Sequence, residues 1–129
     1  MTLRIVTDIL KVTAKYNKHV IFIAHEGAPS TNDDGAVLFV TLSLGGQLPQ
    51  QMGLKLNEIW YMQDTGKERK IALRPFRIYK PMKSRMIKLP ESVEPFVWKY
   101  DVENPDPKYE LATMFEQWKA KGDKIDFPK

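Results

Sequence analysis

One short run constrains the fold of this chain more than any other feature. His19–Ala24 (HVIFIA) is rich in β-branched residues and does not alternate polar with apolar side chains. A strand covered on both faces, as in the centre of a parallel sheet, has this pattern. Leu3, Val6 and Leu10 lie before it at helical spacing and predict an amphipathic helix that ends near Asn17. A helix, a turn and a buried strand make half of a βαβ unit, so we predict an α/β fold with a central parallel strand.

The chain after this strand predicts smaller elements. Gly27–Gly35 is a polar loop of the kind that is often functional. Four elements are then predicted in order: a strand over Ala36–Ser43, a short helix around Pro49–Gly53, a strand over Leu56–Gln63 and its antiparallel hairpin partner over Arg69–Phe76. The turn Asp64-Thr65-Gly66 joins the last two, and Pro75 favours a strand end or an edge there.

The last third of the chain has a different composition. Leu89–Pro107 contains four prolines and is predicted to be a wrapping or linking arm. Asp106-Pro107 then has the residues of a helix start, and Gly122 those of its end. We therefore predict two regions, an α/β core over residues 1–88 and a proline-rich arm with a C-terminal helix over residues 89–129.

Positive charge is concentrated in one part of the chain. The formal net charge is only +4, but Lys67–Lys88 contains nine basic residues and one acid, Glu68. Such a stretch favours a polyanionic partner. Within it, Arg69, Arg74, Arg77, Tyr79 and Lys80 are the candidate nucleic-acid-binding residues, because single strands are held by stacking on aromatic rings and by neutralised phosphates. The alternative is a solvated basic loop with Phe76 in the core.

Two further groups could carry chemistry. His25 and Glu26 follow the predicted strand directly, at the carboxyl end where open α/β sheets bind ligands. They could contact a phosphate, polarise a water molecule or switch between ligand states. The alternative is a histidine bonded to loop backbone beside a solvated glutamate.

Lys83 and Arg85 are separated by one residue, so on an extended segment both side chains project to the same side. Such a pair suits a phosphate, because lysine supplies a point charge and arginine a bidentate fork.

Several common sites are absent from the sequence. There is no G-x-x-x-x-G-K-[ST] phosphate loop, no zinc-type histidine spacing and no cysteine. The absence of cysteine fits a reducing compartment. Arg4 and Asp8 interrupt the apolar residues of the N-terminus, which therefore has no signal-peptide pattern, and no apolar run is long enough for a membrane span. We expect a cytoplasmic protein with no membrane partner.

The order of these pieces resembles a known family. The helix, VIFIAHEG, the polar loop, LSLGGQLPQQM, NEIWYM, the hairpin strand and the K-x-R of Lys83-Ser84-Arg85 are similar to the C-terminal half of the phage RecA-like ATPases, a group that includes nucleotide-binding proteins associated with single-strand annealing. The resemblance covers Leu3 to Ile87. It implies a partial RecA-like P-loop NTPase core over residues 1–88 and a host-cell cytoplasmic location for a phage-encoded chain.

The resemblance also implies roles for individual residues. His25, with Glu26 beside it, matches the polar sensor that reads the γ-phosphate. Asn32–Gly35 and Leu44–Gln51 match two loops that face single-stranded DNA. Lys83 and Arg85 match the fingers that reach from one subunit into the nucleotide of its neighbour, where they would neutralise charge on the transferred phosphoryl group.

The chain departs from this family in one important respect. The phosphate loop and the Walker B aspartate of the family lie upstream of the helix with which this chain begins. ATP and Mg²⁺ are thus expected only if a partner chain supplies the phosphate loop, and the chain alone is not expected to hydrolyse ATP. We expect a fragment or split part of such an ATPase, acting on single-stranded DNA in recombination or replication, as a homo-oligomer or with a phosphate-loop-bearing subunit.

Two other classes of function stay open. One is a non-catalytic nucleic-acid-binding module that uses the basic stretch Arg69–Lys88 and not His25. The other is a structural or interaction protein that keeps the α/β core and docks through the arm and its aromatic residues.

Overall fold

The structure of the chain is a computed structural model that describes residues 3–39, 43, 48–75, 82–89, 91 and 94–128. The chain divides into two compact units. Unit one contains residues 1–56 and 78–81, and unit two contains residues 57–77 and 82–129. The predicted boundary at residue 88, between an α/β core and a proline-rich arm, stays a prediction.

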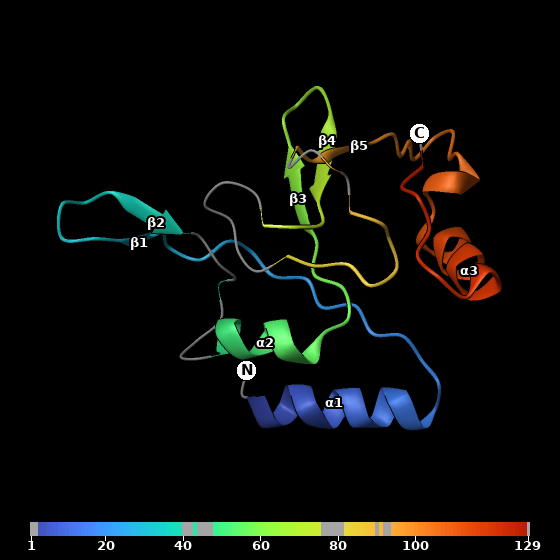
Figure 1. The fold of residues 1–129 in the computed structure, drawn as a ribbon, viewed down its shortest axis with the longest axis horizontal. Coiled ribbons are helices and arrows are strands. Elements are labelled where there is room, and N and C mark those ends of the chain that lie inside the picture. The colour runs from blue at the N-terminus through green and yellow to red at the C-terminus, as the bar shows by residue number, and fades with distance from the viewer. Residues whose placement is uncertain are drawn as a thin grey trace. The chain divides into compact units, whose positions relative to one another are not determined.

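Unit one contains two helices and a small hairpin. Helix α1 (Leu3–Lys15) lies beside helix α2 (Leu48–Lys55), and strands β1 (Ser30–Thr31) and β2 (Val37–Phe39) form an antiparallel pair (Figure 1). The fully buried core residues are Val6 and Met52, against which the partly buried Leu3, Leu10, Phe22 and Leu56 pack. The predicted helices before Asn17 and around Pro49–Gly53 are therefore present.

Helix α1 ends as its sequence predicts. Asn17 has a φ of 51°, in the left-handed region that asparagine tolerates better than most residues. The amide of Asn17 donates to the carbonyl of Ala14 at 3.1 Å, and that of Lys18 donates to the carbonyl of Thr13 at 2.8 Å. This is the Schellman arrangement, which satisfies the last carbonyls of the helix.

The predicted central parallel strand over His19–Ala24 is wrong. Both sheets among the described residues are antiparallel, and this segment belongs to neither. Phe22 packs on the core of unit one, whereas the side chains of Ile21 and Ile23 are 71% and 92% exposed. A β-strand requires a neighbouring backbone for its ladder. Among the described residues, His19–Ala24 has no ladder partner and therefore forms no strand.

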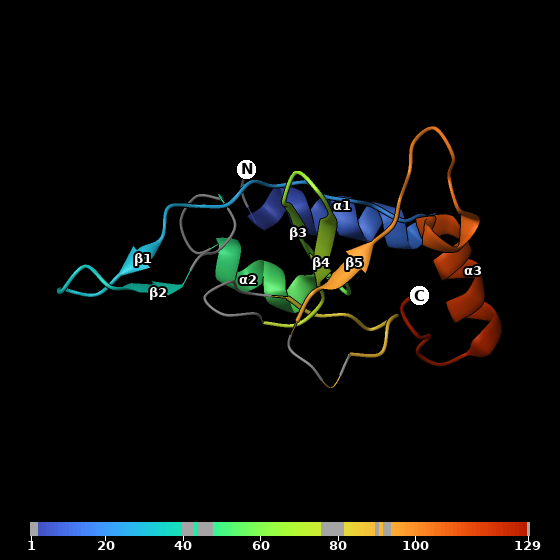
Figure 2. The same cartoon turned by 90° about the horizontal axis from the view of Figure 1, so that it is seen from above.

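Unit two contains a three-stranded antiparallel sheet in the order β3 (Tyr61–Asp64), β4 (Arg69–Ala72), β5 (Phe96–Trp98) (Figures 1 and 2). The predicted hairpin is confirmed, although β3 is shorter than Leu56–Gln63. Gly66 has a φ of 78°, and its amide donates to Asp64 Oδ1 at 2.8 Å, which explains the turn sequence. Strand β4 ends before Pro75 and lies in the middle of the sheet rather than at its edge.

The arm over Leu89–Pro107 contains strand β5, which its proline-rich sequence did not predict. Strand β5 pairs with β4 through three register pairs that begin with Arg69 opposite Trp98. Pro95 directly precedes this strand, a position in which proline interrupts no ladder bond. The paired edge of β4 and the core beneath it decide the conformation of these three residues.

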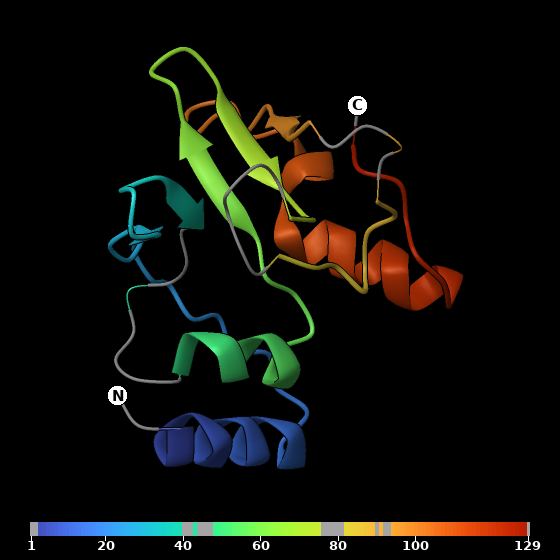
Figure 3. The same cartoon turned by 60° about the vertical axis from the view of Figure 1, so that its left-hand side comes forward.

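A last helix and the residues after it contribute to the core of unit two. Asp106 accepts a hydrogen bond from the amide of Lys108 at 3.2 Å and begins the short 3₁₀ turn η1 (Pro107–Tyr109), which α3 (Leu111–Lys121) follows (Figure 3). Gly122, with a φ of 69°, ends α3 as predicted. The buried core consists of Ile71, Leu73, Met86, Ile87, Tyr109, Met114, Ile125 and Phe127.

Candidate functional site

The Lys83-Ser84-Arg85 segment is fixed to the start of β3 by backbone bonds. Ile59 and Lys83 form an antiparallel bridge in which each amide donates to the carbonyl of the other, at 2.9 and 3.0 Å. Ser84 is buried, and its hydroxyl accepts a hydrogen bond from the amide of Ile87 at 2.8 Å. The ammonium of Lys124 donates to the carbonyl of Ser84 at 3.3 Å. The segment is therefore held both by a residue that precedes it in the sequence, Ile59, and by one that follows it, Lys124.

A single carboxylate completes this arrangement. Glu58 Oε1 accepts hydrogen bonds from the amides of Arg85 at 2.6 Å and Met86 at 2.8 Å. Its second oxygen, Oε2, accepts one from the indole Nε1 of Trp60 at 2.8 Å. Hydrogen bonds to an ionised acceptor are shorter and stronger than neutral ones. Glu58 thus fixes the backbone at Arg85 and Met86, where the chain bends.

The two basic side chains of this segment differ in exposure. The side chain of Lys83 is half-buried, and that of Arg85 is exposed. In the described part of the chain, no carboxylate forms an ion pair with Arg85. Arg85 therefore presents an available guanidinium fork on an ordered backbone, which is what recognition of a phosphate or carboxylate in another molecule requires. Because the chain bends at Arg85 and Met86, the condition of an extended segment, under which both side chains would project to one side, is not met here.

His25 and Glu26 belong to unit one, whereas Lys83 and Arg85 belong to unit two. Both His25 and Glu26 are exposed, and they follow a segment that is not a sheet strand, although Glu26 itself forms a single β-bridge. The carbonyl of His25 accepts a hydrogen bond from the amide of Ser43 at 2.8 Å. This bond brings together His25, which precedes β1, and Ser43, which follows β2. Asn32–Gly35, matched by the resemblance to a DNA-facing loop, forms the turn between those strands, with Asn32 Oδ1 accepting from the amide of Ala36 at 2.8 Å.

The predicted nucleic-acid-binding residues are only partly described. Arg69 begins β4, and its guanidinium Nε lies 3.6 Å from Asp64 Oδ2 across the hairpin. Arg74 is half-buried just after β4. Arg77, Tyr79 and Lys80 lie outside the described residues, as do positions 44–47 of the second predicted DNA-facing loop.

Sequence reasoning did not single out Glu58. The only signal is that an acid stands before the apolar residues of NEIWYM. Its hydrogen-bond partner Arg85 is 27 residues away, and no local pattern connects them. The nearest clue is Trp60, whose indole donor requires an acceptor when it is partly buried.

The residues of this chain do not fit a complete site for ATP and Mg²⁺. The sequence has no phosphate loop, and the described segments bring together no group of three or more acidic or histidine side chains that could hold a metal ion. Among the helices in the described ranges, none has the length and apolar character that crossing a membrane demands. Comparison of the chain with protein-family models, curated proteins and solved structures finds no match.

Proposed function

We propose that this chain is a part of a phage RecA-like ATPase that acts on single-stranded DNA in recombination or replication. In this assembly it supplies Lys83 and Arg85 to a nucleotide bound by a neighbouring subunit, and His25 with Glu26 as the sensor of the γ-phosphate. The observation that carries the proposal is the Arg85 side chain, which is exposed on a backbone held by Glu58.

The chemistry of phosphoryl transfer explains why a fixed arginine would be useful. Negative charge spreads over the oxygens of the transferred group in the transition state, and a guanidinium already in position stabilises that charge with little reorganisation. The hydrogen bonds from the Arg85 and Met86 amides to Glu58 order the backbone before a nucleotide arrives. The lysine beside it adds a second positive charge. The nucleotide and Mg²⁺ themselves would be held by the phosphate loop of the partner, in the cytoplasm of the host cell.

Arg69 and Arg74 are the proposed DNA contacts among the described residues of unit two, and Arg77, Tyr79 and Lys80 are those that the sequence adds. Binding that depends on phosphate neutralisation weakens as salt increases. The first test is the binding of fluorescein-labelled oligo(dT) to the full chain across a salt series, with and without ATP and Mg²⁺. We expect salt-sensitive binding that ATP alters once a phosphate-loop-bearing subunit is added.

The finger assignment has its own test. The double variant Lys83→Ala, Arg85→Ala should abolish the ATPase activity that the wild-type chain stimulates in such a mixed assembly. Lys119→Ala, which removes an exposed lysine on α3, is the matched control and should leave turnover unchanged. Full turnover by the double variant would refute the finger assignment. Salt-sensitive DNA binding that never responds to ATP would instead favour a non-catalytic nucleic-acid-binding module.

The exposed isoleucines of unit one favour a third function, that of an interaction protein. Ile21 and Ile23 present apolar side chains to solvent on a segment that belongs to neither of the described sheets. Neighbouring exposed apolar side chains can mark a surface that contacts another protein. A chain that fails to bind DNA but associates through this segment would be a structural component rather than an ATPase part.

A further inference from the structure

Unit two contains a hollow of about 510 Å³ that the sequence analysis does not anticipate. It lies between the tip of the β3–β4 hairpin and the end of β5, and its lining includes Lys67, Arg69, Trp98, Lys99 and Tyr100. The lining also contains the acidic residues Asp64 and Glu68, but its basic and aromatic residues are of the types that hold single-stranded nucleic acid.

The register of the sheet explains how these residues meet. Arg69 of β4 lies opposite Trp98 of β5 in the antiparallel ladder. The ladder ends at this pair, and beyond it Lys67 of the hairpin turn and Tyr100 after β5 both line the hollow. The hairpin turn and the residues after β5 therefore face each other although more than 30 positions separate them in the sequence.

The ion pairs in and around the hollow leave its positive charge in excess. Asp64 and Glu68 are the acidic residues in its lining, and each already pairs with a base, Arg69 at 3.6 Å and Lys70 at 3.4 Å. Lys67 and Lys99 are exposed, and neither forms an ion pair in the part of the chain that is described. Two ammonium groups are thus available to an anion at this position, and the neighbouring carboxylates are partly neutralised.

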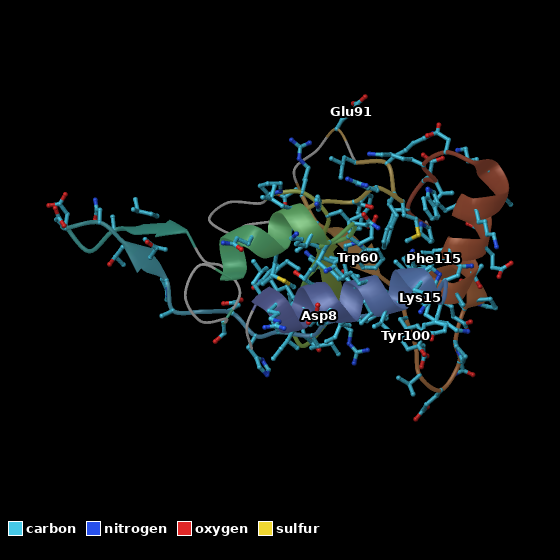
Figure 4. The ribbon with its side chains drawn as sticks, turned by 90° about the horizontal axis from the view of Figure 1, so that it is seen from below. Asp8, Lys15, Trp60, Glu91, Tyr100 and Phe115 are labelled. Atoms are coloured by element: carbon cyan, nitrogen blue, oxygen red, sulfur yellow. The ribbon has the colours of Figure 1, made fainter. Side chains whose placement is uncertain are left out.

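An ordered row of aromatic rings ends at the hollow. The rings of Trp60 and Trp98 meet edge to face at 5.8 Å, and those of Trp98 and Tyr100 at 6.5 Å (Figure 4 labels Trp60 and Tyr100). Tyr100 is 39% exposed, so part of its ring is accessible. Trp98 Nε1 is buried and has no hydrogen-bond acceptor within the described residues. The row holds the Tyr100 ring in place, which reduces the entropy that a stacking partner would otherwise have to remove.

We propose that this hollow binds one nucleotide of a single-stranded nucleic acid, with the base stacked on Tyr100 and the flanking phosphates neutralised by Lys67 and Lys99. The inference rests on the DNA-binding part of the proposed function and extends it to Lys67, Lys99 and Tyr100, which are not among the nucleic-acid-binding residues that the sequence predicts. It needs no ATP and no partner subunit.

The test measures oligo(dT) binding to the full chain by fluorescence anisotropy across a salt series. Tyr100→Ala should weaken binding by about 5- to 100-fold, the range for loss of one stacked base, without changing the salt slope. Tyr100→Phe keeps the aromatic face and should restore most of the affinity. Lys67→Ala and Lys99→Ala should each lower the slope of log K against log salt by about 0.7. Tyr16→Ala, an exposed tyrosine of unit one, and Lys119→Ala are the matched controls.

The outcomes separate this inference from the proposed function. Ultraviolet crosslinking of bound oligo(dT) should place an adduct on or beside Tyr100. If the wild-type chain binds DNA but the Tyr100 and lysine variants bind equally well, the hollow is not the contact, although DNA binding by the chain stands. If the wild-type chain binds neither oligo(dT) nor oligo(U), both fail. Binding of oligo(U) alone, with the same response to the variants, would keep the hollow and replace DNA with RNA as its ligand.

Discussion

The carboxylate of Glu58 is the part of this structure whose removal has the most distinct expected effect. It accepts hydrogen bonds from the amides of Arg85 and Met86 and from the indole of Trp60, at 2.6 to 2.8 Å. All three donors lose their acceptor in Glu58→Ala. The Lys83–Arg85 segment then keeps its bridge to Ile59 but loses the group that orders its bend. Stability of unit two and order at Arg85 should therefore decrease together.

The magnitude follows from the strength of bonds to a charged acceptor. Each contributes about 1.5–3 kcal/mol when its donor is well buried. The amide of Arg85 is exposed and the other two donors are only partly buried, so water replaces part of what is lost. We therefore expect Glu58→Ala to lower the free energy of unfolding by about 3 kcal/mol, less than the sum of three bonds. Glu58→Gln keeps one side-chain oxygen for the backbone amides of Arg85 and Met86 but turns an NH₂ group toward the indole N–H of Trp60. It should lower the free energy of unfolding by about 1–2 kcal/mol.

Urea unfolding followed by tryptophan fluorescence is the assay. All three tryptophans, Trp60, Trp98 and Trp118, belong to unit two, so the signal reports that unit. Glu116→Gln, an exposed substitution on α3, is the control and should stay within about 0.5 kcal/mol of wild type. Trp60→Phe removes the indole donor, and on this background Glu58→Gln should cost about 1 kcal/mol less than it does alone.

Two results would refute this reasoning. If Glu58→Ala and Glu58→Gln both unfold at the urea concentration of Glu116→Gln, the carboxylate does not hold the segment. If Glu58→Gln costs the same with and without the Trp60 indole, the bond to Trp60 contributes nothing and the loss has another origin.

Three further predictions use other parts of the fold. Gly122→Ala places a side chain at a φ of 69° and should cost about 1–2 kcal/mol, with Gly122→Asn costing less; equal stability of all three proteins in urea would contradict the left-handed end of α3. Met114→Ala empties a position with no exposed surface and should cost about 2–5 kcal/mol by the same measurement, whereas a loss below about 1 kcal/mol would place that side chain outside the core. Ile23→Lys changes a side chain that is 92% exposed and should leave the circular-dichroism melting curve unchanged, while sedimentation should show weaker self-association than in wild type. A large loss of stability in Ile23→Lys would mean that the segment is buried in solution.

The sequence predicted the candidate site unevenly. The K-x-R spacing within a basic stretch made Lys83 and Arg85 candidates, because spacing and charge are visible in any sequence. The sequence could not predict the hydrogen bonds that hold this segment, because Glu58 and Arg85 are 27 positions apart and Lys124 and Ser84 are 40 apart. The hollow beside Tyr100 likewise depends on the pairing of β4 with β5, and β5 is too short for a pattern of its own.

The sequence by itself determined the elements that depend on neighbouring residues. Asn17 and Gly122 end their helices, Asp64 and Gly66 form the hairpin turn, and Asp106 begins the last helical segment, because each of these conformations depends on residues a few positions apart. Tertiary structure decided which extended segments became strands. His19–Ala24 has a strong strand composition but no ladder partner in the described chain, whereas Phe96–Trp98 follows a proline and pairs with β4. Composition makes a segment suitable for a sheet, but only a second backbone at hydrogen-bonding distance makes it a strand.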